Sequence, residues 1–411
     1  MKALDGVKIL DLTQILAGPF CTQLLSDHGA DVVKMEPVGG DQSRRIGLKP
    51  GIEEGMNGTY SPYFESINRN KRSIVVDLRQ ESGKDIVRRM VGQIDVLVEN
   101  FRVGVMDRLG LGYEDLSKIN PKLVYATIRG FGDPRSGESP YVNWPSYDII
   151  AQSTGGILSI TGHPDEPMKI GPGIGDTLPG IYLAFGIVSA LRHAERTGKG
   201  QFVDVCMSDA ILTITERIIY QFQTDGVSPK SEGNFHPFFC PYGLYRASDG
   251  WVAIGCISSD FWAKLTRIMG CPELGLRDDL KNDALRGAQR DFVNKTVESW
   301  TMRHTKKEIT AALGGIVPMG PVNTAEDILR DPHFRSRNML VEVEKMGRHE
   351  EKTLLVNTAV KLAASPGGVS HRAPYLGEHT RVLLAEFGFE ADEIAELTRQ
   401  KVVIANQAPR D

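Results

Sequence analysis

The 411-residue sequence has no excess of positive charge, because 48 Lys and Arg residues are outnumbered by 52 Asp and Glu residues. The formal net charge is −4 at pH 7, and the charges are spread along the chain without blocks. A protein that binds nucleic acid or an anionic membrane surface usually carries a basic patch. We therefore expect neither a nucleic acid nor a membrane as a partner.

Cysteine is scarce, and its spacing shows no pairs. The five cysteines are odd in number and include no Cys-x-x-Cys pair, and the nine histidines include no His-x-x-x-His pair. These spacings argue against a disulfide framework, a zinc site and any other metal site. We expect a protein of the reducing cytoplasm.

Long hydrophobic runs are also missing. The longest apolar run, from Ile181 to Leu191, is much shorter than the roughly 20 residues that a membrane span requires. The first residues after Met1 show no signal-peptide pattern. The sequence therefore predicts a soluble protein without a targeting segment.

What the sequence does contain is a regular alternation of strand and helix patterns. The β-branched runs at 7–12, 31–35, 73–78, 95–98 and 123–128 predict strands, and the segments at 19–29, 86–91 and 113–119 predict helices between them. This alternation is typical of βαβ units. The fold class is therefore expected to be α/β, with a large Rossmann-like parallel sheet.

A strand pattern at 202–207 and a long helix pattern from about Ser208 are followed by a change of composition, which divides the chain into parts. Residues 224–240 are crowded with Asp, Gly, Ser, Pro and Asn and predict a linker after a first large domain at 1–223. Residues 241–330 predict a smaller α+β domain, with a strand at 251–255, helices at 261–269, 291–302 and 306–313, and a turn at 318–321. Residues 331–411 are expected to return to the large domain, with strands at 340–344 and 353–356 and two amphipathic helices after Gly377.

The loops that follow the carboxyl ends of parallel strands form the ligand crevice in such sheets. The segments in this position are 13–19, 79, 99–102 and 130–132. Arg79, Arg102 and Arg108 lie on or just after these strands and could bind phosphate groups through their planar guanidinium donors. Solvated surface charge is the alternative interpretation of each arginine.

Asp176 lies between a glycine-rich stretch at 171–175 and a predicted helix, where an Asp most often caps the helix. Pro179 at the first helical position would move the cap to Leu178 and leave the Asp176 carboxylate free to point into the crevice. A carboxylate with a reference pKa of about 3.9 is ionised at neutral pH and can act as a nucleophile without a general base. The same glycines do not form a dinucleotide fingerprint, because Asp176 stands where that motif needs glycine.

Several segments together resemble the class III CoA-transferase family, which includes formyl-CoA transferases, succinyl-CoA:dicarboxylate and acetyl-CoA:oxalate CoA-transferases, and the α-methylacyl-CoA racemases. The resemblance covers nearly the whole chain. The segments that carry it are Leu4–Thr13, Ala17–Pro19, Gly29–Lys34, Asn70–Ser73, Glu99–Phe101, Gly175–Asp176, Thr197–Gly200 and Leu376–His379.

The resemblance implies an enzyme that moves CoA from an acyl-CoA donor to a small carboxylate or dicarboxylate through an aspartyl-CoA thioester on Asp176. Coenzyme A enters as a substrate, and no tightly bound cofactor is implied. The residues that the resemblance places at CoA are Leu16, Ala17, Val76, Asp77, Leu78, Arg79, Asn100, Phe101, Arg102, Arg108, Tyr147 and Asp148.

The resemblance also implies an interlocked homodimer, with the site between the large domain of one subunit and the small domain of its partner. Leu16 stands where formyl-CoA transferase has an active-site Gln, and Pro37 where that enzyme has a CoA-contacting Arg. The segment from Gly233 to Pro237 resembles the short loop of the succinyl-CoA:dicarboxylate and acetyl-CoA:oxalate relatives. Within it, His236 is expected either to contact the distal carboxylate of the substrate or to stabilise the loop.

Racemisation at the α-carbon is the alternative function within the family. The racemases pair a catalytic Asp with a His in a Gly-His-Asp segment, and this chain has Ser146, Tyr147 and Asp148 there. A Tyr with a pKa of about 10 is a poor general base at neutral pH. The sequence therefore favours CoA transfer over racemisation.

Overall fold

The computed structural model describes residues 1–47, 61–345 and 348–405. The chain divides into two compact units, the first formed by residues 1–157, 170–217 and 333–411 and the second by residues 158–169 and 218–332. Residues 158–169 thus belong to the second unit, whereas the sequence analysis assigned them to the large domain.

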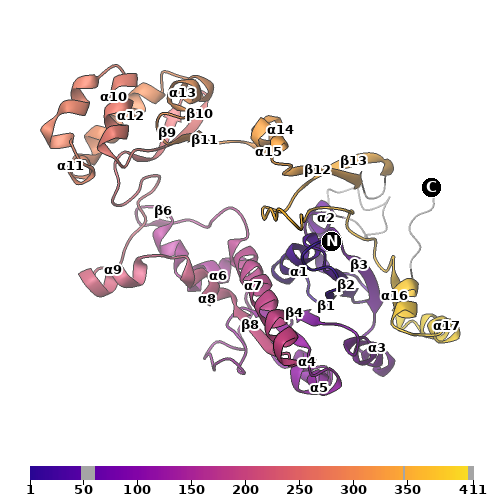
Figure 1. The fold of residues 1–411 in the computed structure, drawn as a ribbon. Helices are drawn as coiled ribbons and strands as arrows, with labels where there is room; N and C mark the ends of the chain where they lie inside the picture. The colour runs from indigo at the N-terminus through magenta and orange to yellow at the C-terminus, as the bar shows by residue number, and fades with distance from the viewer. Residues whose placement is uncertain (48–60, 346–347, 406–411) are drawn as a thin grey trace. The chain divides into compact units, whose positions relative to one another are not determined.

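The first unit is built on a seven-stranded sheet with the order β14-β3-β2-β1-β4-β5-β8 (Figure 1). Six strands run parallel, and β14 pairs antiparallel with β3. The strands are β1 (Lys8–Asp11), β2 (Asp31–Glu36), β3 (Arg72–Val76), β4 (Val96–Glu99), β5 (Val124–Arg129), β8 (Phe202–Cys206) and β14 (Val403–Ile404). The prediction of an α/β fold with a Rossmann-like parallel sheet is confirmed.

Strand β1 is where the direction of strand addition reverses. Ile9 lies beside Val32 of β2 on one side and beside Val96 of β4 on the other. The chain therefore moves outward from β1 through β2 and β3, then returns and moves the other way through β4 and β5. A crevice opens at such a switch point, at the carboxyl ends of the strands.

Helices cover both faces of this sheet. The helices and 3₁₀ turns of the first unit up to residue 217 are α1 (Ala17–Asp27), η1 (Gln42–Arg45), α2 (Pro62–Asn68), α3 (Glu81–Val91), α4 (Val105–Arg108), α5 (Tyr113–Ile119), α6 (Asp148–Thr154), η3 (Ile157–Ile160, crossing the boundary of the unit), α7 (Ile174–Thr197) and α8 (Met207–Thr213). After residue 331 the chain adds α15 (Pro332–Ser336), β12 (Leu340–Lys345), β13 (Arg348–Val356), α16 (Thr380–Glu386) and α17 (Ala391–Arg399). Helices α1 and α7 pack against each other, and both contact β5.

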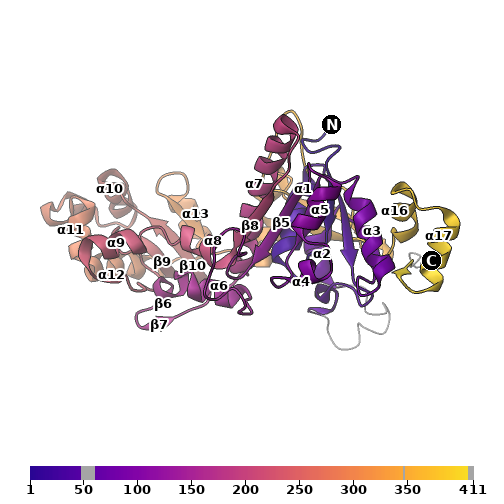
Figure 2. The same cartoon turned by 90° about the horizontal axis from the view of Figure 1, so that it is seen from below.

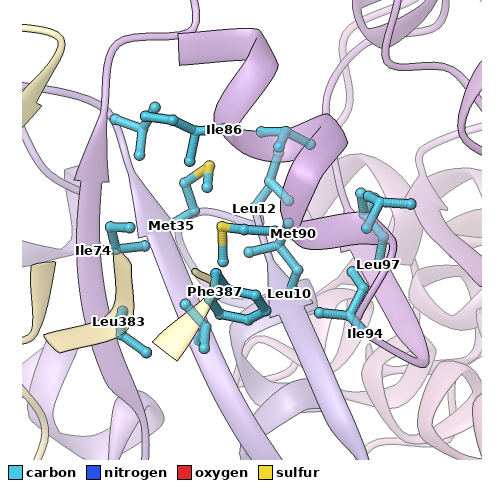
Figure 3. Close-up of a cluster of buried hydrophobic side chains, with 14 of the residues drawn as sticks. Leu10, Leu12, Met35, Ile74, Ile86, Met90, Ile94, Leu97, Leu383 and Phe387 are labelled. Carbon is cyan, nitrogen blue, oxygen red and sulfur yellow. The ribbon is translucent and has the colours of Figure 1, made fainter. Parts of the chain in front are cut away.

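The C-terminal helices complete the core beside α3 (Figures 1 and 2). Leu383 of α16 and the neighbouring Phe387 lie among Leu10, Met35 and Met90, from two strands and α3 (Figure 3). Burying a side chain of this size contributes about 1.5–3 kcal/mol. The last part of the chain is therefore held to the first sheet by hydrophobic packing.

The second unit has a small antiparallel sheet of order β11-β10-β9, formed by β9 (Tyr242–Ala247), β10 (Gly250–Gly255) and β11 (Met319–Pro321). Trp262, Tyr245 and Val297 lie in its core. Its other elements are β6 (Gly162–His163), β7 (Glu166–Pro167), α9 (Ile218–Asp225), α10 (Ser259–Ile268), η4 (Pro272–Leu276), η5 (Asp278–Leu280), α11 (Asp283–Ala288), α12 (Arg290–Thr301), α13 (Lys306–Leu313) and α14 (Ala325–Arg330).

Three local predictions were wrong. The segment at 318–321 is not a simple turn, because Gly320 pairs with Ala253 in the small sheet. The long helix expected from Ser208 ends at Thr213, and Glu216 then adopts a left-handed φ of 50°, which a helix does not allow. Helix α7 begins at Ile174, so Pro179 lies inside it rather than at its first position.

Helix α7 is the one described helix that is long and apolar enough to cross a membrane by length and composition. Its buried face, which includes Leu183 and Ile187, packs within the first unit. The neighbouring Ile181, Phe185 and Val188 are exposed and follow helical spacing. Packing accounts for the apolar residues on one side of the helix, whereas those on the other side are exposed.

Candidate active site

A cavity of about 560 Å³ lies at the switch point of the sheet, within the first unit. Its walls come from the loops after β1, β4 and β5, together with residues 142–147 and Asp176 of α7. A volume of this size is typical of a small-molecule or cofactor site. The position and the size together mark this cavity as the candidate active site.

Most of the expected site residues line this cavity. Arg102 and Arg108 come from the segment after β4, and both are exposed. Their guanidinium groups form no hydrogen bond or ion pair with any residue that the structure describes. The lining includes the predicted Leu16, Ala17, Asn100, Phe101, Arg102, Arg108, Tyr147 and Asp176.

The predicted segment from Val76 to Arg79 is not part of the cavity lining. Arg79 instead pairs with Asp77 at 2.8 Å and is largely exposed. The physical reason is the strand order, because β3 is separated from the switch point by β2. The rule for strand ends therefore selected loops that line the cavity and one loop that does not.

Several lining residues were not predicted from the sequence, including Gln42, Arg129, Trp144 and Met207. Arg129 is the last residue of β5. It fell between the predicted strand at 123–128 and the loop at 130–132 that was expected to form the crevice. Gln42 belongs to η1, and no pattern in the sequence connects it to the loop after β1. Only the fold brings these residues together.

Asp176 lies in the first turn of α7, and its neighbour Asp148 holds that turn in place. The N-cap residue Gly173 has no side chain, and the Oδ1 atom of Asp148 accepts a hydrogen bond from the Gly175 N–H at 2.8 Å instead. Gln152 donates through Nε2 to both Asp148 oxygens at 2.9 Å. Asp148 does not line the cavity, and its contacts make it a support for the Asp176 turn.

Close packing between helices also places Asp176. Gly180, one helical turn after Asp176, lies so near α1 that a Cβ atom there would be 2.7 Å from the carbonyl oxygen of Ala17. Asp176 therefore projects from the side of α7 that faces α1. The N–H groups of Ala17 and Gly18, at the start of α1, donate to no residue that the structure describes.

The protonation of Asp176 differs from the sequence expectation. Burial, followed by the negative charge of Asp148, raises the pKa of Asp176 from its ordinary value of 3.8 to about 7. The expectation of a carboxylate that is fully ionised at neutral pH is therefore wrong. A raised pKa in a cavity is typical of a group that takes part in chemistry.

Gly233 and His236 belong to the second unit and do not line the cavity. The Nδ1 atom of His236 accepts hydrogen bonds from the N–H groups of Phe238 and Phe239, both at 3.1 Å. The imidazole ring also stacks on Phe239 with 4.5 Å between centroids. These contacts organise the loop.

No cluster of three His, Cys, Asp or Glu side chains that could hold a metal ion occurs among residues 1–47, 61–345 and 348–405. All five cysteines are free thiols, and burial raises the pKa of Cys206 to about 12. Among the described residues that line the cavity, Asp176 supplies the carboxyl group.

Comparison with known proteins identifies the family. The model of CoA-transferase family III matches residues 4–380. Succinyl-CoA:mesaconate CoA-transferase of Haloarcula hispanica is 42% identical over 392 residues, covering 94% of this chain and 97% of the relative. Formyl-CoA:oxalate CoA-transferase of Rhodopseudomonas palustris is 35% identical, covering 96% of each chain.

A solved structure agrees with these relatives. The crystal structure of a CAIB/BAIF family protein from Brucella suis superimposes with a TM-score of 0.83 at 36% identity, covering 94% of this chain and 99% of the other. The resemblance inferred from the sequence motifs is therefore confirmed. This chain belongs to CoA-transferase family III and is a CoA-transferase.

Proposed function

We propose that the enzyme transfers CoA from succinyl-CoA or a similar donor to a small dicarboxylate through a covalent intermediate on Asp176. Relatives with names of this type include the succinyl-CoA:mesaconate enzyme, a succinyl-CoA:D-citramalate enzyme from Chloroflexus aurantiacus and a succinate:glutarate enzyme from Agrobacterium fabrum. The observation that carries the proposal is a carboxyl group of raised pKa in a cavity that is also lined by Arg102 and Arg108, two arginines that pair with no residue among those the structure describes.

The proposed reaction begins when an Asp176 oxygen attacks the thioester carbonyl of the donor. The C–S bond breaks, CoA leaves as a thiolate, and a mixed anhydride remains on Asp176. The thiolate then attacks the Asp176 carbonyl carbon, which releases the donor acid and forms the aspartyl-CoA thioester. The acceptor carboxylate repeats these two steps in reverse order and leaves with CoA, which regenerates Asp176.

The surrounding residues have distinct proposed roles. Arg102 and Arg108 neutralise CoA phosphates, and the lining residues Leu16, Ala17, Asn100, Phe101 and Tyr147 contact the rest of the CoA. The free N–H groups at the start of α1 are suited to stabilise the negative charge that develops on the attacked oxygen. Family resemblance also assigns Val76, Asp77, Leu78 and Arg79 to CoA, and Asp148 positions Asp176.

We further propose an interlocked homodimer. The exposed apolar side chains of α7 at Ile181, Phe185 and Val188 support it, because exposed apolar stripes often mark protein interfaces. The sequence-based division places the large domain at 1–223 and 331–411, the small domain at 241–330 and the linker at 224–240, and it differs from the two compact units mainly at residues 158–169 and 218–223. In this arrangement Gly233 and His236 contact the substrate. We also propose that the enzyme is cytoplasmic and that it needs no tightly bound cofactor.

The central experiment measures the mass of the intact protein during turnover. Incubation with succinyl-CoA should increase the protein mass by the mass of the group bound covalently to Asp176. Hydroxylamine should inactivate the enzyme only when acyl-CoA is present. Asp176→Asn should abolish exchange while CoA binding survives, and Asp165→Asn, a surface change in the second unit, serves as the matched control. Full turnover by Asp176→Asn, or trapping on another residue, would refute the nucleophile assignment.

Two further measurements define the reaction. A panel of short monocarboxylates and dicarboxylates, offered with labelled succinyl-CoA, should yield new thioesters from dicarboxylates. The racemase alternative predicts uptake of deuterium at the α-carbon of a 2-methylacyl-CoA in heavy water. We expect no such uptake, since Tyr147 replaces the histidine base.

A further inference from the structure

The loop of residues 13–16, between β1 and α1, has an unusual backbone. Ile15 adopts a φ of 71°, in the left-handed region that β-branched residues strongly avoid. Such a conformation persists only where the surroundings impose it, and it is typical of functional sites. The next two residues, Leu16 and Ala17, line the cavity with Asp176.

Side chains alone hold the first half of this loop, because the N–H groups of Thr13, Gln14 and Ile15 form no hydrogen bond to the backbone of any described residue. Asp11 accepts from the Thr13 N–H at 2.9 Å. Asn100 accepts from the Gln14 N–H and donates to the Gln14 carbonyl, both at 2.9 Å. The loop is thus shaped by distant residues and not by regular secondary structure.

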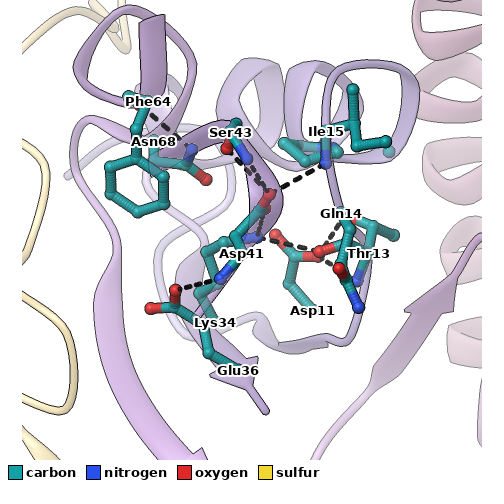
Figure 4. A network of polar contacts seen from close by, with 12 residues as sticks. Asp11, Thr13, Gln14, Ile15, Lys34, Glu36, Asp41, Ser43, Phe64 and Asn68 are labelled. Atoms are coloured by element: carbon teal, nitrogen blue, oxygen red, sulfur yellow. Dashed lines mark hydrogen bonds and ion pairs between the residues drawn. The ribbon is translucent and has the colours of Figure 1, made fainter. Parts of the chain in front are cut away.

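Two buried charged side chains bind the backbone of Ile15 and of Thr13 (Figure 4). The Oδ1 atom of Asp41 accepts from the Ile15 N–H at 3.1 Å, while the Nζ atom of Lys34 donates to the Thr13 carbonyl at 2.8 Å. The same two side chains form an ion pair of 2.8 Å, and neither is exposed at all. A single charge pair therefore holds the backbone on both sides of Gln14.

Asp41 is itself fixed from several directions. Its N–H donates to Glu36 at 3.0 Å, and its Oδ1 atom also accepts from the N–H and the hydroxyl of Ser43, both at 2.8 Å. Glu36 is held in turn by Arg44 at 2.7 Å. Although burial opposes ionisation, the Lys34 ammonium and these hydrogen bonds keep the pKa of Asp41 below its usual value. The acceptor for the Ile15 N–H is therefore a rigid, charged oxygen.

We propose that Asp41 is a positioning residue for CoA transfer: with Lys34, it imposes the left-handed conformation of Ile15 and so presents Leu16, Ala17 and the start of α1 to Asp176. This inference rests on the proposed role of Asp176. Asp41 does not line the cavity and acts only through the loop. Displacing the loop would separate Asp176 from its neighbours on α1 without changing the arginine rim.

The test compares Asp41→Ala and Asp41→Asn with Asp27→Asn. Asp27 is an equally buried carboxylate of the first unit, paired with Arg69 at 2.6 Å and remote from the lining residues. All three variants should lose stability to urea. Asp41→Ala should also lower kcat by about 100-fold, since small misplacements near reacting groups have effects of this size. The KM for succinyl-CoA should change by a much smaller factor than kcat, because Arg102 and Arg108 are not held by Asp41, and Asp27→Asn should keep wild-type kcat.

A second site provides a test that loss of stability cannot imitate. Glycine adopts a positive φ without steric cost. Asp41→Ala should therefore lower kcat by a smaller factor in the Ile15→Gly background than in the wild-type background. Ile15→Ala removes the side chain but keeps the preference for negative φ, so in the Ile15→Ala background Asp41→Ala should lower kcat by as large a factor as in the wild-type background. If Asp41→Ala fails to fold, the same comparisons are made with Asp41→Asn.

The possible results separate this inference from the proposed function. If the wild-type enzyme forms no adduct on Asp176, the proposed function fails. If the adduct forms and the Asp41 variants keep wild-type kcat, or lose no more of it than Asp27→Asn, the positioning role is refuted while the nucleophile stands. An equal effect of Asp41→Ala on kcat in the Ile15→Gly and Ile15→Ala backgrounds would also refute it.

Discussion

The raised pKa of Asp176 makes the proposed nucleophile sensitive to pH near neutrality. With a pKa of about 7, half of the free enzyme has an ionised Asp176 at that pH, and about a tenth has it one pH unit lower. The kcat/KM for succinyl-CoA should therefore fall about tenfold per pH unit below the midpoint. The assay is a pH profile of initial rates at limiting donor concentration.

Asp148→Asn tests the cause of the shift. Burial is the larger cause and remains, but the negative charge is lost, so the midpoint of the profile should move to lower pH. The introduced amide oxygen can still accept the Gly175 N–H. Asp165→Asn should leave the midpoint unchanged. A flat profile between pH 6 and 8, or a wild-type midpoint near 4, would refute the reasoning.

The same shift predicts a stability cost. Between pH 3.8 and about 7 the folded protein holds a proton on Asp176 that the unfolded chain has lost, so the unfolding free energy falls as the pH rises through this range. The difference between the two pKa values corresponds to a stability cost on the order of 4 kcal/mol. Solvent screening reduces this cost, because the side chain is only partly buried. Asp176→Asn should therefore be more stable than wild type at pH 8 and equally stable near pH 3, as measured by urea unfolding. A less stable variant at pH 8 would contradict this.

Two further predictions concern the walls of the cavity. Gly175→Ala should lower kcat, because the added Cβ would lie 2.5 Å from the carbonyl oxygen of Asp148 and displace the Asp176 turn. Gly92→Ala, where the nearest contact is 3.6 Å, should have wild-type activity. Equal rates for the two variants would contradict the proposed packing constraint. Arg108→Gln should raise the KM for succinyl-CoA and make this KM less dependent on salt, with a smaller effect on kcat. Steady-state kinetics at several ionic strengths would measure both effects. An unchanged KM would remove Arg108 from the phosphate site.

The sheet was predictable because its signal is local. Strands β1 to β5 are short, buried, β-branched runs, and their predicted positions differ from the observed ones by one or two residues. Strand β14 was missed because it has only two residues and pairs with β3 at a distance of more than 300 residues along the chain. The break after Thr213 was missed because a left-handed Glu216 leaves no pattern in the sequence.

The site was predictable in part. Motifs and the strand-end rule selected the loops that hold Asn100, Arg102 and Asp176, all of which line the cavity. They also selected Arg79, which the strand order keeps out of the lining. Strand order is set by how helices pack across a sheet, and the alternation of elements does not specify it.

The sequence by itself determined the α/β class, the family and the candidate nucleophile, because each depends on residue types at fixed spacing. The tertiary structure decided the protonation of Asp176, whose neighbour Asp148 reaches it from another helix, and the conformation of Ile15, which Asp41 holds from beyond β2. Desolvation, charge interaction and backbone strain depend on distances through space. They are set only when segments far apart in the chain have packed together.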